Sequence, residues 1–275
     1  MQENSKQSYD SVLTIATSDS GGGAGVQADL KTISALGCYG MSAFAALTAQ
    51  NTQEVRDIHE VPPQFLRDQI DVVVEDFEVD AVKIGMLFTG ELMQVVADCI
   101  EKHNLKNVVL DPVMVSQSGA QLIKDGAIAV IRETLFPLAD LITPNIPEAE
   151  RLLGRELEGE EQMKEAVYDL LDTGTGGVLL KGGHFKEEQS IDYLSIADEN
   201  PELHQFKAKR IETDNTHGTG CTLSSAIAAY LAKGYPMPKA VEQAKLYITQ
   251  AIAAGSQYRI GGGGGPLHHF HQFWN

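Results

Sequence analysis

The chain has 275 residues, of which 43% are hydrophobic and 21% are charged, and its formal net charge is −17. A chain of this length is expected to form a single domain, residues 1–275, whose core needs no disulfide or structural metal. Nucleic-acid binding is not expected, because the chain is acidic and lacks the clusters of Lys and Arg that bind phosphate backbones.

The cysteine content and the hydrophobicity pattern predict a cytoplasmic protein. Cys38, Cys99 and Cys221 do not show the spacing of a zinc site, and an odd, sparse count suits free thiols in a reducing compartment. The amino-terminal segment is polar, and no apolar run approaches the roughly 18–20 residues of a membrane span. We therefore expect no membrane association.

Short apolar runs alternate with helical patterns along most of the chain. Strands are predicted at Val12–Ala16, Ser42–Thr48, Ala81–Gly85, Asn107–Asp111, Ala139–Thr143 and Gly177–Lys181. Helices are predicted at Gln64–Phe77, Glu91–His103, Cys221–Lys233 and Pro238–Gly255. Several strands are apolar at consecutive positions, which is typical of parallel strands covered on both faces. The pattern predicts an α/β fold with a mostly parallel sheet between helices.

Three further segments depart from this alternation. Glu54–Val61 alternates polar and apolar residues, whereas Ser190–Ala197 and Leu203–Ile211 look like the two arms of a hairpin. We expect all of them to be antiparallel or edge strands, and Glu54–Val61 to be the edge through which a homodimer forms. Gly261–Gly265 is a run of five glycines, which composition alone predicts to be a flexible turn.

The strongest local motif is Asn215–Cys221, which leads directly into a predicted helix. Gly218 and Gly220 allow a tight turn, and the free N–H groups at the helix start, with Thr219, would make an anion site. We expect Cys221 to lie in the first helical turn, where the same field would lower the pKa of its thiol. The alternative interpretation is an ordinary glycine turn, with Cys221 as a buried filler.

A second glycine-rich segment, Ser18–Asp29, follows the first predicted strand. It lacks the Gly-Lys-Ser/Thr of a P-loop, although Gly23-x-Gly25-x-x-Ala28 satisfies a relaxed dinucleotide fingerprint. No acidic residue follows at the end of the second strand, which argues against an NAD(P)-dependent oxidoreductase. We instead expect a loop over a small substrate, with Asp29 and Gln50 supplying hydrogen bonds.

Three predicted strands end in polar residues, and ligands of parallel α/β sheets bind beyond such ends. The residues are Asp111, then Asn145 and Glu148, then Lys181. Asp111, Asn145 and Glu148 would suit a hydrated Mg²⁺ ion, and Lys181 would suit a phosphate. The alternative is that strand ends simply carry polar residues and helix caps.

In this order, the motifs resemble the hydroxymethylpyrimidine and phosphomethylpyrimidine kinases of thiamine biosynthesis, which belong to the ribokinase-like superfamily. The resemblance runs from about Thr14 to the His-Phe tail. It rests on Ser18–Thr32, Thr48–Thr52, Lys83–Leu87, Asp111–Met114, Thr143–Glu148, Lys181–His184 and Asn215–Leu223. It implies a three-layer α/β/α sandwich and two transfers of the ATP γ-phosphate. The first acceptor would be 4-amino-5-hydroxymethyl-2-methylpyrimidine, and the second its monophosphate.

The resemblance also implies roles for single residues. Gly21, Asp29, Gln50, Met86 and Val113 would surround the pyrimidine. Asp111, Asn145 and Glu148 would serve Mg²⁺ and phosphate, Lys181 the phosphate chain, Gly218, Thr219 and Gly220 the anion hole, and Cys221 would be the catalytic base. Some pyridoxal kinases also carry a cysteine at the last position, so a pyridoxal/pyridoxine kinase remains an alternative. A ligand sensor without catalysis, on the same fold, is another.

Overall fold

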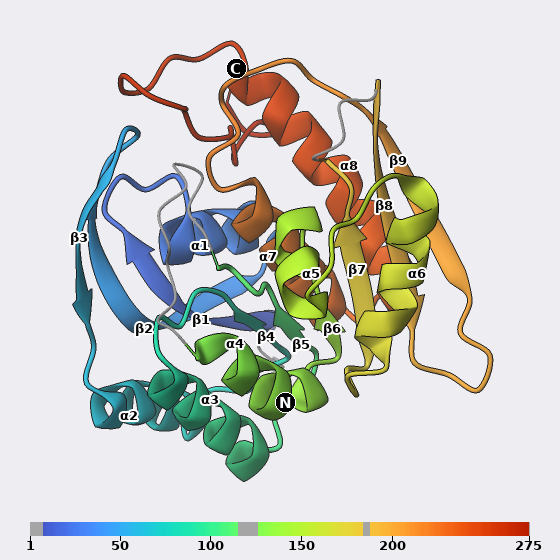
Figure 1. The fold of residues 1–275 in the computed structure, drawn as a ribbon. Helices are drawn as coiled ribbons and strands as arrows, with labels where there is room; N and C mark the ends of the chain where they lie inside the picture. The colour runs from blue at the N-terminus through green and yellow to red at the C-terminus, as the bar shows by residue number, and fades with distance from the viewer. Residues whose placement is uncertain (1–7, 115–125, 184–187, 275) are drawn as a thin grey trace, which may run out of the picture.

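The computed structural model describes residues 8–114, 126–183 and 188–274, so His184 of the motif Lys181–His184 lies outside the described residues. The described strands form one nine-stranded sheet with the order β3-β2-β1-β4-β5-β6-β7-β8-β9 (Figure 1). They are β1 Ser11–Asp19, β2 Tyr39–Gln50, β3 Val55–Glu60, β4 Ala81–Ile84, β5 Val108–Leu110, β6 Leu141–Ile142, β7 Gly177–Lys181, β8 Gln189–Ile196 and β9 Leu203–Lys209.

The sheet has a parallel centre and antiparallel edges. All neighbouring pairs from β2 through β1, β4, β5 and β6 to β7 are parallel. β3 pairs antiparallel with β2 at one edge, and the hairpin β8–β9 pairs antiparallel with β7 at the other. The predicted parallel strands, the edge strand and the hairpin are thereby confirmed, whereas the homodimer through β3 stays a prediction.

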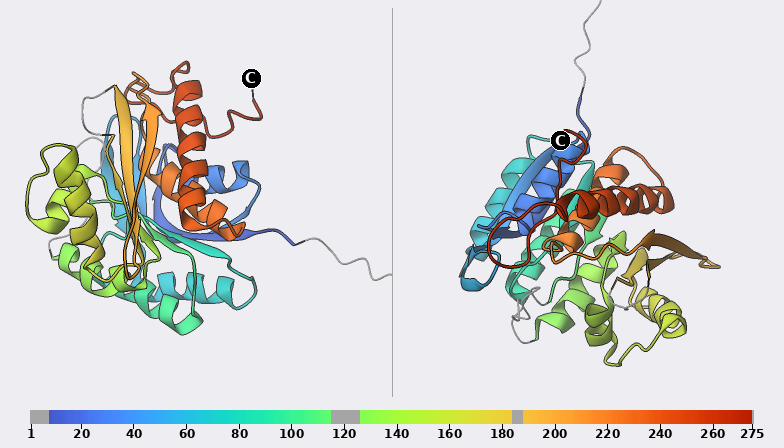
Figure 2. Two further views of the ribbon diagram at one scale, coloured as in Figure 1. Left: turned by 90° about the vertical axis from the view of Figure 1, so that its right-hand side faces the viewer. Right: turned by 90° about the horizontal axis from the view of Figure 1, so that it is seen from above.

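Helices cover both faces of the sheet, as the views in Figure 2 show. They are α1 Gly25–Ala35, α2 Pro63–Val74, α3 Gly90–His103, α4 Ala127–Val130, α5 Ile146–Leu153, α6 Glu160–Leu171, α7 Thr219–Ala232 and α8 Met237–Gly255. α5, α6 and the turns around α4 were not among the predicted helices. Within the described part of the chain, every helix is too short or too polar to span a bilayer.

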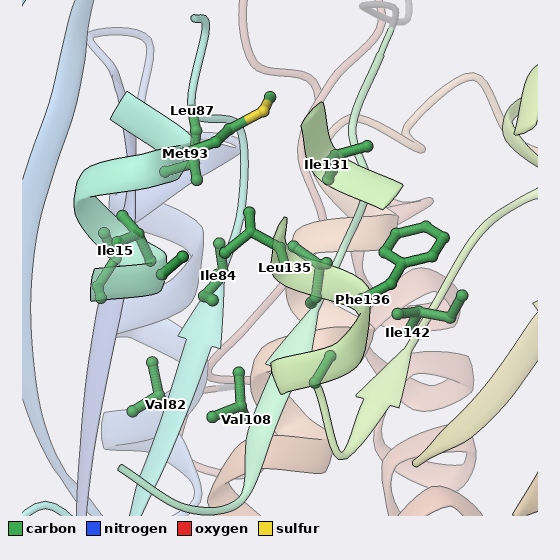
Figure 3. Packing of buried hydrophobic residues seen from close by; sticks show 14 of the residues in the cluster. Ile15, Val82, Ile84, Leu87, Met93, Val108, Ile131, Leu135, Phe136 and Ile142 are labelled. Atoms are coloured by element: carbon green, nitrogen blue, oxygen red, sulfur yellow. The ribbon is translucent and has the colours of Figure 1, made fainter. Parts of the chain in front are cut away.

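Two hydrophobic clusters, one on each face, confirm the three-layer sandwich. Val82 and Ile84 of β4 belong to the cluster that includes residues of α2, α3, α5 and α6, part of which is drawn in Figure 3. Ala81 of the same strand belongs to the other cluster, with residues of α1, α7 and α8. Successive side chains of a strand point to opposite faces, so a continuous apolar run supplies both cores.

The glycine run Gly261–Gly265, which we call the glycine strap, is packed against two other segments, and this corrects the expectation of a flexible turn. The Gly263 N–H donates to Thr52 Oγ1 at 3.1 Å, and the Gly265 N–H donates to Asn215 Oδ1 at 3.1 Å. A Cβ on Gly263 would lie 2.0 Å from the Thr52 carbonyl oxygen, and one on Gly265 would lie 2.3 Å from Asn215 Oδ1. Glycine is needed here because the backbones approach so closely.

Candidate active site

The site lies at the carboxyl edge of the parallel strands, where several segments of the chain converge. β1 ends at Asp19, β2 ends at Gln50, Asp111 follows β5, and β7 ends at Lys181. β1 pairs with β2 on one side and β4 on the other, so the order of strands reverses beside it. Ligands of open α/β sheets bind at such a switch point.

Lys181, Asp111 and Gly220 meet on one side of the site. Lys181 Nζ lies 2.8 Å from Asp111 Oδ1, which also accepts a hydrogen bond from Thr143 Oγ1 at 3.2 Å. A Cβ on Gly220 would lie 3.2 Å from Asp111 Oδ2 and 3.4 Å from Lys181 Nζ. Burial lowers the pKa of Lys181, but the carboxylates of Asp111 and Glu148 outweigh it and keep this pKa above its usual value. A charged lysine therefore stands beside the start of α7.

Asn145 and Glu148 form a capping box at the start of α5. Asn145 Oδ1 accepts from the Glu148 N–H at 2.9 Å, and Glu148 Oε2 accepts from the Asn145 N–H at 2.8 Å. Burial raises the pKa of Glu148 to about 7, although the charge of Lys181 opposes the rise. The alternative that these residues cap a helix is therefore confirmed, and a role in binding Mg²⁺ stays a prediction.

The carboxylates here fit a magnesium ion that arrives with a phosphorylated ligand. Among the described residues, no group of three or more His, Cys, Asp or Glu side chains is arranged to hold a metal ion. Mg²⁺ is commonly bound through one or two carboxylates, several waters and substrate phosphates. Asp111 and Glu148 are both buried and both act on the charge of Lys181, and they would provide that donor set.

The predicted tight turn into α7 is confirmed, whereas its role as an anion site stays a prediction. Gly218 has φ 84°, in the left-handed region, and a Cβ there would lie 1.9 Å from the Gly23 carbonyl oxygen. The N-cap residue of α7 is Gly218, which offers no side chain to cap the helix start. The N–H and the Oγ1 of Thr219 both donate to the Thr216 carbonyl, at 3.2 and 2.7 Å, which closes the turn.

Cys221 lies in the first turn of α7, as predicted, but the predicted lowering of its pKa is wrong. Burial raises the pKa of the Cys221 thiol to about 11, with Asp29 and Asp111 adding to the rise and Lys83 opposing it. Desolvation of a thiolate outweighs the field of the helix start here. At neutral pH the thiol of the free protein is therefore protonated.

Asp29 is fully buried, together with Lys83, in an ion pair. Lys83 Nζ lies 2.9 Å from both carboxylate oxygens of Asp29, which also accept from Thr14 Oγ1 at 2.7 Å and from Ser225 Oγ at 2.8 Å. The structure therefore places Asp29 behind the site as the counter-ion of Lys83. A direct contact with a pyrimidine stays a prediction, and it would require one of these bonds to be exchanged.

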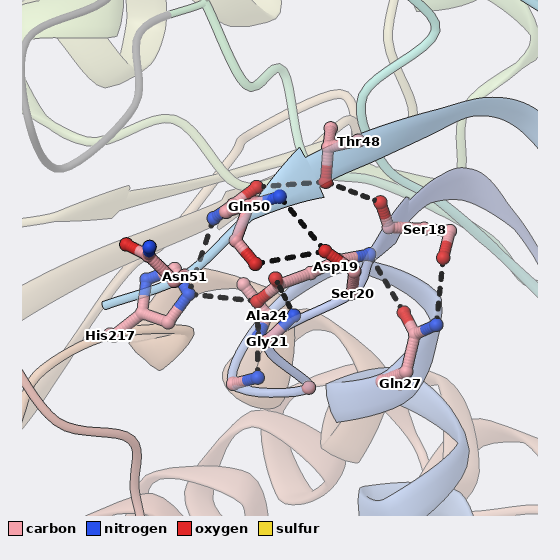
Figure 4. A network of polar contacts seen from close by, with 12 residues as sticks. Ser18, Asp19, Ser20, Gly21, Ala24, Gln27, Thr48, Gln50, Asn51 and His217 are labelled. Carbon is pink, nitrogen blue, oxygen red and sulfur yellow. Dashed lines mark hydrogen bonds and ion pairs between the residues drawn. The ribbon is translucent and has the colours of Figure 1, made fainter. Parts of the chain in front are cut away.

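Asp19 organises the loop between β1 and α1, as Figure 4 shows. Its carboxylate accepts from the N–H groups of Gly21, Gly23 and Ala24 at 2.8, 3.0 and 2.9 Å. His217 Nε2, from the turn before α7, lies 2.9 Å from Asp19 Oδ2. Burial alone would raise the pKa of Asp19, but these hydrogen bonds outweigh it and lower the pKa. An ionised carboxylate thus joins the first loop to the turn before α7.

Gln50 lies beside this network. Its backbone N–H donates to Ser20 Oγ at 2.8 Å, and its Oε1 accepts from Thr48 Oγ1 at 3.1 Å. Its Nε2 lies 3.4 Å from His217 Nε2. A hollow of about 250 Å³ lies next to it, lined by Ser20, Ala49, Gln50, Asn51, Glu54 and Arg56. Gln50 thus lines this hollow and also lies beside His217, which directly precedes Gly218.

The structure brings Gly21 to Gln50, because a Cβ on Gly21 would lie 3.3 Å from the Gln50 carbonyl oxygen. Met86 is buried just after β4, and its carbonyl accepts from Thr17 Oγ1 of β1 at 3.0 Å. Val113 is half-buried, and its N–H donates to the Asp111 carbonyl at 2.8 Å. All of these stand at the carboxyl edge of the sheet, and their contacts with a ligand stay predictions.

Asp19, His217 and Lys83 lie inside the motifs identified in the sequence, but no role was predicted for them. Asp19 lies three residues beyond the predicted strand Val12–Ala16 and directly before Ser20 and a run of glycines, a position where a carboxylate often accepts backbone N–H bonds. His217 directly precedes Gly218. Lys83 occurs in the middle of an apolar strand, where a charged residue needs a buried partner. These sequence positions are the signals from which a role for each of the three residues could have been predicted.

Known proteins match this chain over nearly its whole length. The family model described as "Phosphomethylpyrimidine kinase" matches residues 19–268. A "Thiamine biosynthesis bifunctional protein" of Geobacter sulfurreducens is 52% identical over 259 residues, which are 94% of this chain and 52% of that protein. This chain therefore spans about half the length of that relative. A "Hydroxymethylpyrimidine/phosphomethylpyrimidine kinase" of Rhizobium meliloti is 48% identical, over 95% of this chain and 97% of that one.

A solved structure is similar to the whole fold. The ADP complex of Bacillus subtilis pyridoxal kinase superposes with a TM-score of 0.87 and 36% sequence identity, over 96% of this chain and 99% of that one.

Proposed function

The chain belongs to the phosphomethylpyrimidine kinase family, and on this premise we propose that it transfers the γ-phosphate of ATP to 4-amino-5-hydroxymethyl-2-methylpyrimidine and then to the resulting monophosphate. The observation that carries the proposal is the series of neighbours from the Gln50 amide, beside His217, through the turn into α7 to the charged Lys181, which lies next to Gly220. The first suits a heteroaromatic ring and the other two suit phosphate.

Phosphoryl transfer depends chiefly on positioning and on stabilisation of charge. Lys181 and the N–H groups of Gly218–Gly220 would hold the transferred phosphate between them. Asp111 and Glu148 would hold Mg²⁺, which neutralises phosphate charge when it is bound. The Lys181–Asp111 ion pair already fixes the lysine at the start of α7, so little reorganisation is needed when ATP binds.

The two acceptors differ in one proton. The alcohol must lose its hydroxyl proton during the first transfer, and we propose that the thiolate form of Cys221 accepts it and becomes the thiol. The monophosphate is already an anion, so the second transfer needs no base. One site can therefore serve both steps if the start of α7 also tolerates the phosphate of the second acceptor.

The test is an ADP-release assay with ATP, Mg²⁺ and one acceptor at a time. We expect ADP with hydroxymethylpyrimidine and with its monophosphate, and much less with pyridoxal. ADP with pyridoxal alone would assign the chain to the alternative that the Bacillus subtilis structure suggests. Binding of the pyrimidine without ADP would instead identify the non-catalytic sensor. The family assignment leaves no support for an NAD(P)-dependent oxidoreductase.

Replacing Gln50 by alanine should raise the KM for hydroxymethylpyrimidine and leave the KM for ATP unchanged. The Gln50 amide offers an acceptor and two donors to the edge of an aminopyrimidine, and an unpaired polar edge costs about 1–3 kcal/mol. Gln64→Ala is the matched control, because Gln64 is a surface residue paired with Asp68 on α2. Steady-state kinetics measures both KM values, and equal rises would assign Gln50 a purely structural role.

A further inference from the structure

Lys245 of α8 forms a buried pair with a carboxylate of the hairpin β8–β9. Its Nζ lies 2.6 Å from Asp192 Oδ2 and 3.1 Å from Ser190 Oγ, both on β8. The side chains of Lys245 and Asp192 are only 11% and 4% exposed. A buried charge needs a partner, and each of these two residues supplies one for the other. The pair therefore joins α8 to the antiparallel edge of the sheet.

Asp192 is also the neighbour of Lys181, the last residue of β7. The two residues are directly opposite each other in the antiparallel pairing of β7 with β8. Leu179 and Leu194, two positions away on the same strands, belong to one hydrophobic cluster, so Lys181 and Asp192 project from the same face of the sheet. The Gly182 N–H donates to Asp192 Oδ1 at 3.0 Å, which holds this carboxylate beside the end of β7.

The ammonium group of Lys181 nevertheless pairs with a different carboxylate. Opposite charges at facing positions of two strands attract each other, so the register alone favours a pair between Lys181 and Asp192. Lys181 Nζ instead lies 2.8 Å from Asp111 Oδ1 and next to Gly220 at the start of α7. Lys245 explains this choice, because its own charge already neutralises Asp192.

We propose that Lys245 is a positioning residue for Lys181: by neutralising Asp192, it removes the competing cross-strand partner and directs the Lys181 ammonium to Asp111 and the start of α7. This inference rests on the proposed function, in which Lys181 holds the transferred phosphate. Lys245 is itself buried, so it acts on ATP through Asp192 and Lys181 and not by direct contact.

The first variant is Lys245→Met, which keeps an unbranched side chain but removes its charge. It leaves the Asp192 carboxylate buried with the Gly182 N–H but without a counter-ion. Lys181 should then turn toward Asp192 and away from Asp111, because an unpaired buried charge is costly. We expect ATP to bind about tenfold more weakly, as for the loss of one hydrogen bond to a charged group. Hydroxymethylpyrimidine should bind as it does to the wild-type protein.

Two further variants separate the charge of Lys245 from its packing and its hydrogen bonds. Lys245→Gln keeps donors for Asp192 and Ser190 but has no charge, so it should also weaken ATP binding. The double variant Asp192→Asn with Lys245→Met removes both charges of the pair. It should bind ATP as the wild-type protein does, because Lys181 no longer has a competing carboxylate. A purely structural role of Lys245 would not give this recovery.

Lys239→Met is the matched control, because Lys239 lies on the same helix and forms an exposed pair with Glu242. It changes the net charge of the protein as Lys245→Met does, and it should leave ATP binding unchanged. Isothermal titration with ATP and Mg²⁺ measures the affinity without an acceptor. Thermal unfolding confirms that each variant is folded, and Lys245→Gln carries the test if Lys245→Met is not.

Unchanged ATP affinity in the variants of Lys245 would overturn the inference, and phosphorylation of the pyrimidine by the wild-type protein would leave the proposed function intact. A double variant that binds ATP as weakly as Lys245→Met would also overturn the inference. So would an equal loss in Lys239→Met, which would assign the effect to net charge. A wild-type protein that binds ATP but releases no ADP with either pyrimidine would contradict the proposed function, and the ATP titrations would still decide the role of Lys245.

Discussion

Replacing Cys221 by alanine is expected to slow phosphorylation of the pyrimidine alcohol by about 10²–10⁴-fold, the usual contribution of a general base. Phosphorylation of the monophosphate should slow far less, because its acceptor oxygen is already ionised. ATP binding should persist, since the backbone N–H groups of Gly218–Gly220 remain. The measurement is the ratio of the rate with the alcohol to the rate with the monophosphate. If this ratio is the same in Cys221→Ala as in the wild-type protein, Cys221 is not the base.

The raised pKa of Cys221 adds a second signature. Burial raises this pKa to about 11, Asp29 and Asp111 raise it further, and Lys83 lowers it. A base is active when deprotonated, so below that pKa the rate with the alcohol should rise by roughly tenfold per pH unit. The rise should be absent in Cys221→Ala and with the monophosphate. Cys38→Ala is the matched control, because burial raises the pKa of Cys38 to about 11 outside the site.

Replacing Asp29 by asparagine should lower the free energy of unfolding by about 3–5 kcal/mol, as expected when one partner of a buried ion pair is removed. The amide keeps the shape of the side chain but leaves the charge of Lys83 buried without a counter-ion. Urea denaturation monitored by circular dichroism measures the loss. A loss no larger than that of a surface pair would show that water reaches Lys83.

Two further variants complete the Asp29 experiment. Glu242→Gln removes one partner of the exposed pair with Lys239 and should cost far less stability than Asp29→Asn, because water screens an exposed pair. The double variant Asp29→Asn with Lys83→Met removes both charges, so it should recover much of the stability that Asp29→Asn loses. A double variant as unstable as Asp29→Asn would indicate that the hydrogen bonds, and not the charges, stabilise this region.

The central sheet was predictable because its strands have a simple pattern. Val108, Val109 and Leu110 are apolar in succession, and the structure buries Val108 and Val109 in cores on opposite faces. Helix α5 was missed for the opposite reason. Its signal is the capping box of Asn145 and Glu148, two polar residues that were assigned to a metal because both suit oxygen-rich sites. One pair of residues can satisfy both patterns, and sequence alone does not rank them.

The positions of the site residues along the chain were predictable, but the burial of their side chains was not. Asp111, Lys181 and the turn before α7 do converge, because strand ends share one edge of a parallel sheet. Asp29 and Cys221 were assigned by their motifs. Their chemistry depends on burial and on Lys83, which lies on β4, far from both in the sequence. Desolvation depends on the packing of the whole domain, and no local pattern encodes it.

The glycine strap has a consequence for the synthesis of the protein. A ribosome makes the chain from its amino end, so Gly261–Gly265 emerges after every described strand and after α8. Until then, neither Thr52 nor Asn215 has its contact with the strap, and His217 lacks its bond to Gly265. A nascent chain that has completed α8 thus carries the whole described sheet but lacks the contacts that hold the turn before α7. The order of translation makes the candidate site one of the last parts of the protein to be completed.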